Sequence, residues 1–96
     1  MTSTFTIKSD HPALPGHFPG HPVVPGVVVI DHLILALGQT HPDRTCIGVR
    51  RMKFLRPLLP DESVEVAFGE AKADSITVKA QVAGEPLVEG RLTLVP

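Results

Sequence analysis

The chain has 96 residues, a length that suits one domain, so residues 1–96 are expected to form a single unit. Lys and Arg number 9 against 10 Asp and Glu, and the net charge of −1 argues against wholesale binding of nucleic acid or a membrane surface. The single cysteine, Cys46, excludes a disulfide framework. With no secretion signal and no apolar run of about 20 residues, a cytoplasmic location is expected.

The first quarter of the chain combines a short strand with a stiff loop. Residues 4–8 alternate polar and apolar side chains, which predicts a strand. Five prolines follow between positions 12 and 25, and each removes a hydrogen-bond donor and keeps its predecessor extended. We therefore expect a rigid loop, of the kind that can aim a side chain.

A helix is predicted from Pro25-Gly26 to about Gly38. Proline suits a first helical turn, and glycine is the usual residue just beyond a helix end. Nearly every position between them is apolar, so the helix is expected to be buried on every face. The valine run alone favours a strand, but the length and the Leu-rich continuation at 33–37 favour a helix.

Four antiparallel strands are predicted after a turn at residues 39–43, which makes the fold class α+β. They are residues 45–55, 63–68, 76–82 and 87–95, with turn signals at 73–75 and 83–85. Their alternation indicates a sheet with one wet face and one face packed on the helix. Because so small a core buries only about 60–65% of the unfolded chain's surface, a second copy is expected to cover more of it.

Asp31 is the most informative single residue. Its helical neighbours at positions 27, 28, 34 and 35 are all apolar, so the carboxyl group is expected in an apolar setting. Desolvation there should raise its pKa, which suits a general acid. The alternative is that Asp31 reaches solvent at a seam or caps a backbone group.

Two features beside this acid each have a chemical and an ordinary interpretation. His17 in the stiff loop either acts as a base near neutral pH or is a surface histidine. Gly26 at the helix start either offers backbone N–H groups to a carbonyl oxygen or merely turns the chain. The histidines at positions 11, 17 and 21 match no common zinc spacing, so no metal site is expected.

One dense basic run stands out in this nearly neutral chain. It comprises Arg50, Arg51, Lys53 and Arg56. Such a run suits the docking of an acidic partner or a phosphate. The alternative is a solvated strand face whose Lys and Arg side chains protect a sheet edge.

Residues 17–26, His-Phe-Pro-Gly-His-Pro-Val-Val-Pro-Gly, are followed by an acid at Asp31, and this pattern resembles the β-hydroxyacyl-acyl-carrier-protein dehydratases of the hotdog fold. A second block, residues 53–61, is similar to the family's strand-and-turn segment. The resemblance runs from about Pro15 to the C-terminus. It implies an antiparallel sheet wrapped around a central helix, and a dimer with active sites at the interface.

The resemblance also implies roles for individual residues. His17 would remove the α-proton of a 3-hydroxyacyl thioester, and Asp31 of the partner subunit would help the hydroxyl leave as water. The Gly26 amide would hold the thioester carbonyl, with Phe18 and Val24 beside the substrate. No metal or redox cofactor is implied, since the substrate arrives on the phosphopantetheine of an acyl-carrier protein or on coenzyme A, and the basic run would dock the carrier.

Two departures from the family pattern keep alternatives open. Leu35 stands where the family commonly has glutamine, and the chain is shorter than typical members, which suggests an open acyl tunnel or a member of polyene-type pathways. The partner is then a second copy or a related hotdog chain. A hotdog thioesterase and a non-catalytic hotdog subunit are the alternative functions. An aspartate at position 31 resembles the branch that also isomerises the new double bond.

Overall fold

Five strands and one helix make up the part of the chain that the computed structural model describes, residues 2–8 and 23–96. In chain order they are β1 (Thr2–Thr6), α1 (Gly26–Thr40), β2 (Thr45–Phe54), β3 (Ser63–Phe68), β4 (Ser75–Val82) and β5 (Glu85–Val95). The four predicted strands after the helix are confirmed to within two residues at every boundary. No helix in these described ranges has the length and apolar character that crossing a membrane requires.

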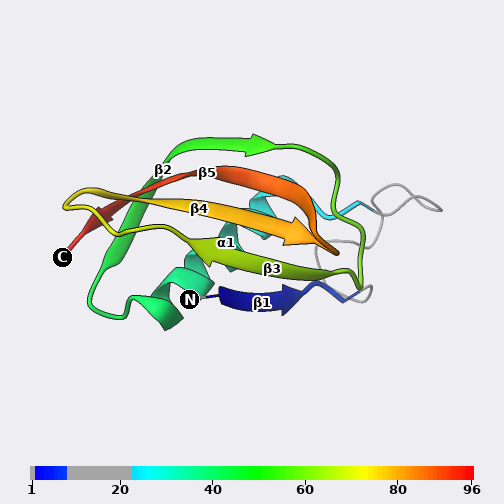
Figure 1. Cartoon of the computed structure of the whole chain (residues 1–96), viewed down its shortest axis with the longest axis horizontal. Helices are drawn as coiled ribbons and strands as arrows, with labels where there is room; N and C mark the ends of the chain where they lie inside the picture. The colour runs from blue at the N-terminus through cyan, green and yellow to red at the C-terminus, as the bar shows by residue number, and fades with distance from the viewer. Residues whose placement is uncertain (1, 9–22) are drawn as a thin grey trace.

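The strands form one antiparallel sheet in the order β1-β3-β4-β5-β2. Figure 1 shows the sheet curving around α1, which lies on its inner side. The expected arrangement of a sheet wrapped around a helix is therefore confirmed. β2 lies at one edge of this sheet and, within the described residues, pairs only with β5.

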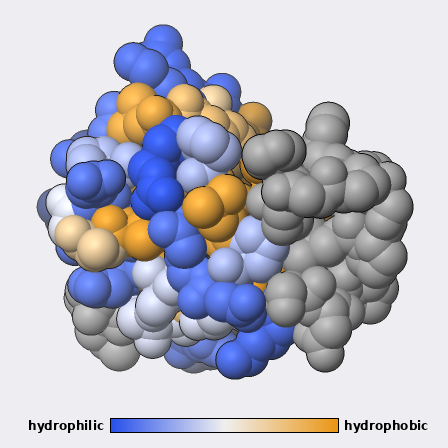
Figure 2. Space-filling view, turned by 90° about the vertical axis from the view of Figure 1, so that its right-hand side faces the viewer, coloured by the Kyte–Doolittle hydropathy of each residue, from blue (hydrophilic) through white to orange (hydrophobic). Residues whose placement is uncertain are grey.

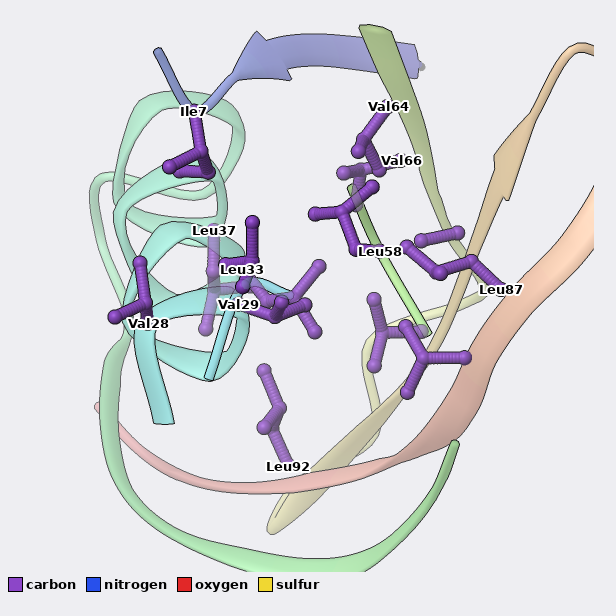
Figure 3. Close-up of a cluster of buried hydrophobic side chains, with 14 of the residues drawn as sticks. Ile7, Val28, Val29, Leu33, Leu37, Leu58, Val64, Val66, Leu87 and Leu92 are labelled. Atoms are coloured by element: carbon purple, nitrogen blue, oxygen red, sulfur yellow. The ribbon is translucent and has the colours of Figure 1, made fainter. Parts of the chain in front are cut away.

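The core lies between the inner side of the sheet and one side of α1. Alternate residues of the strands point inward, so the apolar positions of the period-two pattern are buried, as predicted. Figure 3 shows helix side chains such as Leu33 and Leu37 pointing into the same core as Val64, Val66 and Leu92 from the strands. Each of these five residues is at most 2% exposed.

The C-terminal end of α1 differs from the prediction. The helix continues beyond Gly38 to Thr40, and the His41 amide donates to the Leu37 carbonyl oxygen at 2.7 Å. The Thr40 hydroxyl donates to the carbonyl oxygens of Ala36 and Leu37 at 3.2 and 3.3 Å. These bonds engage the carbonyl oxygens of Ala36 and Leu37, and the helix continues two residues past Gly38, which was predicted to lie just beyond its end.

The expectation that α1 is buried on every face is also wrong for a single chain. The buried residues lie on one side of α1: Val28, Val29, Leu33, Ala36 and Leu37. Val27 and Leu35 are 65% and 62% exposed, and Asp31 between them is exposed as well. Residues four apart share a helix face, so these three form one stripe, which the sheet of the same chain does not cover.

A second uncovered apolar area lies along β2, the edge strand. Ile47 and Val49 are 61% and 42% exposed. The register with β5 shifts between Cys46 and Gly48, and again between Val49 and Arg51, which places Ile47 and Arg50 at irregular positions of the ladder. α1 starts beside Phe54, at the end of β2, and its own end leads into Thr45, at the start of β2, so the two elements run antiparallel.

Candidate active site

A hollow of about 520 Å³ lies at the start of α1. Gly26 and Val29 line it from the helix, Val24 lines it from the segment just before the helix, and residues 54–58 line it from the end of β2 and the loop that follows. The Val24 amide donates to the Leu58 carbonyl oxygen at 2.8 Å, which fixes the entry to the helix against that loop. Figure 2 views this end of the molecule, where apolar patches are set among polar side chains.

The first turn of α1 presents backbone N–H groups at this hollow. Pro25 occupies the N-cap position and offers no side-chain cap, and the first turn has no acidic residue. The Val28 amide donates to the Pro25 carbonyl oxygen at 3.0 Å, whereas the amides of Gly26 and Val27 have no acceptor among the described residues. A helix N-terminus with such N–H groups favours an anionic or strongly polarised oxygen.

Phe54 lies directly against Gly26, and it is the residue that the sequence reasoning missed. A Cβ atom built on Gly26 would meet Phe54 ring atoms at 3.2, 3.4 and 3.8 Å. In β2, Met52 and Phe54 pair with Gly90 and Val88 and face the helix, whereas Arg51 and Lys53 face outward. The period of two in this strand was the signal that could have placed Phe54 beside the helix start.

Asp31 lies on the exposed stripe of α1 and does not line the hollow. Its neighbours Val27 and Leu35 are apolar as expected, but the carboxyl group is exposed in the single chain. The burial that the sequence analysis expected is therefore not supplied by the described residues of the same chain.

Gly26 and Asp31 point to different sides of α1. Successive residues of a helix are rotated by about 100°, so five steps place these two residues about 140° apart around the axis and about 7–8 Å apart along it. The Gly26 side packs on Phe54, and the Asp31 side is uncovered. The Asp31 carboxyl group of a chain therefore does not face the hollow at the helix start of the same chain.

Some of the residues singled out in the sequence lie outside the described part of the chain, and His32 lies inside it. His17 and Phe18 lie outside the described residues, as do the histidines at positions 11 and 21. The His32 ring stacks on Phe5 with centroids 4.9 Å apart, and its Nδ1–H donates to the Val28 carbonyl oxygen at 3.0 Å. His32 thereby ties β1 to the helix. Within the described ranges, no group of three or more His, Cys, Asp or Glu residues could hold a metal ion.

The structure separates the four residues of the basic run. Arg50 forms a salt bridge with Asp74 at 2.9 Å, and this guanidinium holds the pKa of Asp74 below its ordinary value. Arg56 forms a salt bridge with Glu62 at 3.0 Å. The hydrogen bond from the Leu59 amide, together with Arg56, lowers the pKa of Glu62, and these effects outweigh the desolvation that raises it. Arg50 and Arg56 are thus engaged within the chain.

Arg51 and Lys53 instead lie near two further cations, Lys79 of β4 and Arg91 of β5, on the outer side of the sheet. Arg51 lies opposite Arg91, and Lys53 and Lys79 lie on either side of Glu89. These residues line a hollow of about 430 Å³. We call the four cations the outer basic cluster: Arg51, Lys53, Lys79 and Arg91, with Glu89 between the two lysines. Like charges directly opposite each other in a sheet are unfavourable, so this arrangement suits an anionic ligand or partner.

Comparison with known proteins identifies the family of the chain. A family model described as "ApeI-like: ApeI dehydratase" matches residues 1–91. The 3-hydroxyacyl-[acyl-carrier-protein] dehydratase FabZ of Haemophilus influenzae is 31% identical over 99 residues, which cover 90% of this chain and 67% of that protein.

Two solved structures have the same fold. An uncharacterized protein from Erwinia carotovora subsp. atroseptica superposes with a TM-score of 0.83 at 22% identity, covering 99% of this chain and 82% of the other. The dehydratase heterocomplex ApeI:P from Xenorhabdus doucetiae superposes with a TM-score of 0.80 at 22% identity, covering 99% and 86%. Together with the curved sheet around α1, these similarities identify the hotdog fold. The chain belongs to the ApeI-like family of dehydratases.

Proposed function

We propose that the protein dehydrates 3-hydroxyacyl thioesters to trans-2-enoyl thioesters, in fatty-acid or polyene-type biosynthesis. The observation that carries this proposal is the helix start at Gly26, a residue that lines the hollow and whose amide has no acceptor among the described residues. Elimination of a β-hydroxyl group begins with removal of a proton beside a carbonyl, and negative charge develops on the carbonyl oxygen. The similarity to a 3-hydroxyacyl-[acyl-carrier-protein] dehydratase supports this substrate class.

In the proposed reaction, the base is His17 and the acid is Asp31. His17 takes the proton from carbon 2, while the thioester carbonyl oxygen accepts a hydrogen bond from the Gly26 amide. The electron pair of that C–H bond forms the double bond between carbons 2 and 3. The bond between carbon 3 and its hydroxyl oxygen breaks, and Asp31 donates the proton that completes water. The elimination involves no net oxidation or reduction and both proton transfers are assigned to side chains, so we propose neither a redox cofactor nor a metal.

We propose that Asp31 acts in the site of a second chain. The 140° rotation between Gly26 and Asp31, estimated from helix geometry, supports this assignment. The uncovered stripe of α1 and the uncovered edge of β2 support an interface that includes both elements. A second chain packed there would bury Asp31 among apolar side chains, which favours the neutral carboxylic acid that donates a proton.

The second chain in this proposal is another copy or a related hotdog chain. Pairing of two β2 edges would satisfy their unpaired backbone groups and extend the sheet across both chains. The heterocomplex named for the Xenorhabdus doucetiae structure supports including the related chain. The free thiol of Cys46 fits a reducing cytoplasm, where we place the reaction.

We propose that an acidic acyl-carrier protein delivers the thioester and docks on the outer basic cluster. This revises the docking set expected from the sequence, because Arg50 and Arg56 already pair with Asp74 and Glu62. Lys79 joins the set from β4. Charge reversal by Lys79→Glu should raise KM for a carrier-bound substrate and leave KM for a small thioester unchanged. An equal effect on both substrates would contradict docking at this surface.

The proposed activity is tested by mixing the purified protein with a 3-hydroxyacyl thioester and following the absorbance of the conjugated enoyl product. Asp31→Asn should abolish product formation. Asp43→Asn is the matched control, because Asp43 is an exposed aspartate in the turn after the same helix. Release of free thiol without enoyl product would establish a thioesterase instead. Activity that appears only with a related hotdog chain, and that Asp31→Asn leaves unchanged in the mixture, would establish a non-catalytic subunit.

A further inference from the structure

One contact at the helix start goes beyond the proposed roles of Gly26, His17 and Asp31. The three heavy atoms closest to a Cβ placed on Gly26 all belong to the Phe54 ring. The closest, Cζ, would be 3.2 Å away, which is tighter than ordinary van der Waals contact. Among the described residues, the Phe54 ring therefore decides how much room exists beside the Gly26 backbone.

The backbone of Phe54 is held by the sheet, so its ring can move only by rotation of the side chain. Phe54 pairs with Val88 at the end of β2, and the next amide, that of Leu55, donates to the Leu87 carbonyl oxygen at 2.8 Å. The residue is nevertheless 43% exposed and lines the hollow of about 520 Å³. A large apolar ring on a fixed backbone is a wall of this hollow.

A carbonyl oxygen that accepts a hydrogen bond from the Gly26 amide brings carbon 2 of the acyl group into the hollow that Gly26 and Phe54 line together. We propose that Phe54 is a specificity-determining residue that limits this site to 3-hydroxyacyl thioesters without a substituent on carbon 2. The ring leaves space for the hydrogens on that carbon and excludes a methyl group. This inference rests on the proposed function, because it takes the Gly26 amide as the place where the carbonyl binds.

The test compares kcat/KM for a 2-methyl-3-hydroxyacyl thioester with kcat/KM for the unsubstituted compound. Phe54→Leu should raise this ratio by about 10- to 100-fold, since one methyl group in a close-fitting site changes discrimination by that order. Phe68→Leu is the matched control, because Phe68 is a partly buried phenylalanine that packs on the core away from the hollow. The control should leave the ratio unchanged.

A double mutant tests the contact itself. Gly26→Ala should lower kcat/KM for the unsubstituted substrate, and Phe54→Leu added to it should restore most of the loss, because the shorter side chain frees the space that Cβ needs. If Phe54→Leu does not fold, as judged by circular dichroism, Phe54→Met serves in both experiments. An unchanged ratio, or a double mutant no better than Gly26→Ala, would overturn the inference. A wild-type protein that dehydrates neither substrate, alone or mixed with a related hotdog chain, would instead overturn the proposed function.

Discussion

Replacement of Leu35 by lysine should separate the two chains of the proposed dimer. Leu35 is 62% exposed in the single chain and lies on the same stripe as Asp31. Full burial of a leucine side chain contributes about 1.5–3 kcal/mol, so covering this exposed part contributes about 1–2 kcal/mol per chain. A symmetric dimer has two copies, so their loss amounts to about 2–4 kcal/mol, or about 30- to 700-fold in the dissociation constant.

The same substitution should leave the folding of each chain intact. A lysine at position 35 lies one helical turn after Asp31, and such a pair stabilises a helix by about 0.2–0.5 kcal/mol. Sedimentation velocity over a range of concentrations measures the dissociation constant, and circular dichroism measures the fold. Gln81→Lys is the matched control, since it adds the same charge at an exposed position of β4 on the outer side of the sheet. A Leu35→Lys protein that dimerises as tightly as the wild type would refute the proposed interface.

Three further predictions concern the stability of single positions. Ala83 has φ of 50° in the two-residue turn between β4 and β5, so Ala83→Asn should raise the free energy of unfolding by about 0.5–1 kcal/mol, measured by thermal unfolding. Gly90→Ala should lower it by about 1–3 kcal/mol in denaturant unfolding, because the new Cβ would meet a carbonyl oxygen of β2. Glu62→Gln should cost about 1–2 kcal/mol at neutral pH, because Glu62 accepts hydrogen bonds from Leu59 and Arg56. Since the folded-state pKa of Glu62 lies below its ordinary 4.5, this difference should shrink as pH falls below 4.5 in pH-dependent unfolding.

The strands were predictable because their alternation is a local pattern. In β3, the residues Val64 and Val66 are buried while Glu65 between them is exposed, as the period of two requires. The boundary of α1 was less predictable, because Thr40 and His41 supply hydrogen bonds that carry the helix past Gly38. That extension depends on which groups reach the last carbonyl oxygens, and composition alone does not specify it.

The site was predictable only in part, because two of its features depend on contacts between distant segments. An all-apolar helix predicts burial on every face, but it does not say whether its own sheet or a second chain provides the cover. The exposure of Val27 and Leu35 answers this for the single chain. The contact of Phe54 with Gly26 joins residues 28 positions apart, so it needed the register of β2 to become visible.

The central claim is that each active site takes its base from one chain and its acid from another. Mixing two inactive proteins, His17→Ala and Asp31→Asn, after brief unfolding and refolding tests it most directly. Random pairing makes half of the dimers mixed, each with one intact site, so the mixture should regain about a quarter of the wild-type dehydration rate. A mixture that pairs but stays as inactive as its two components would contradict a site shared between chains.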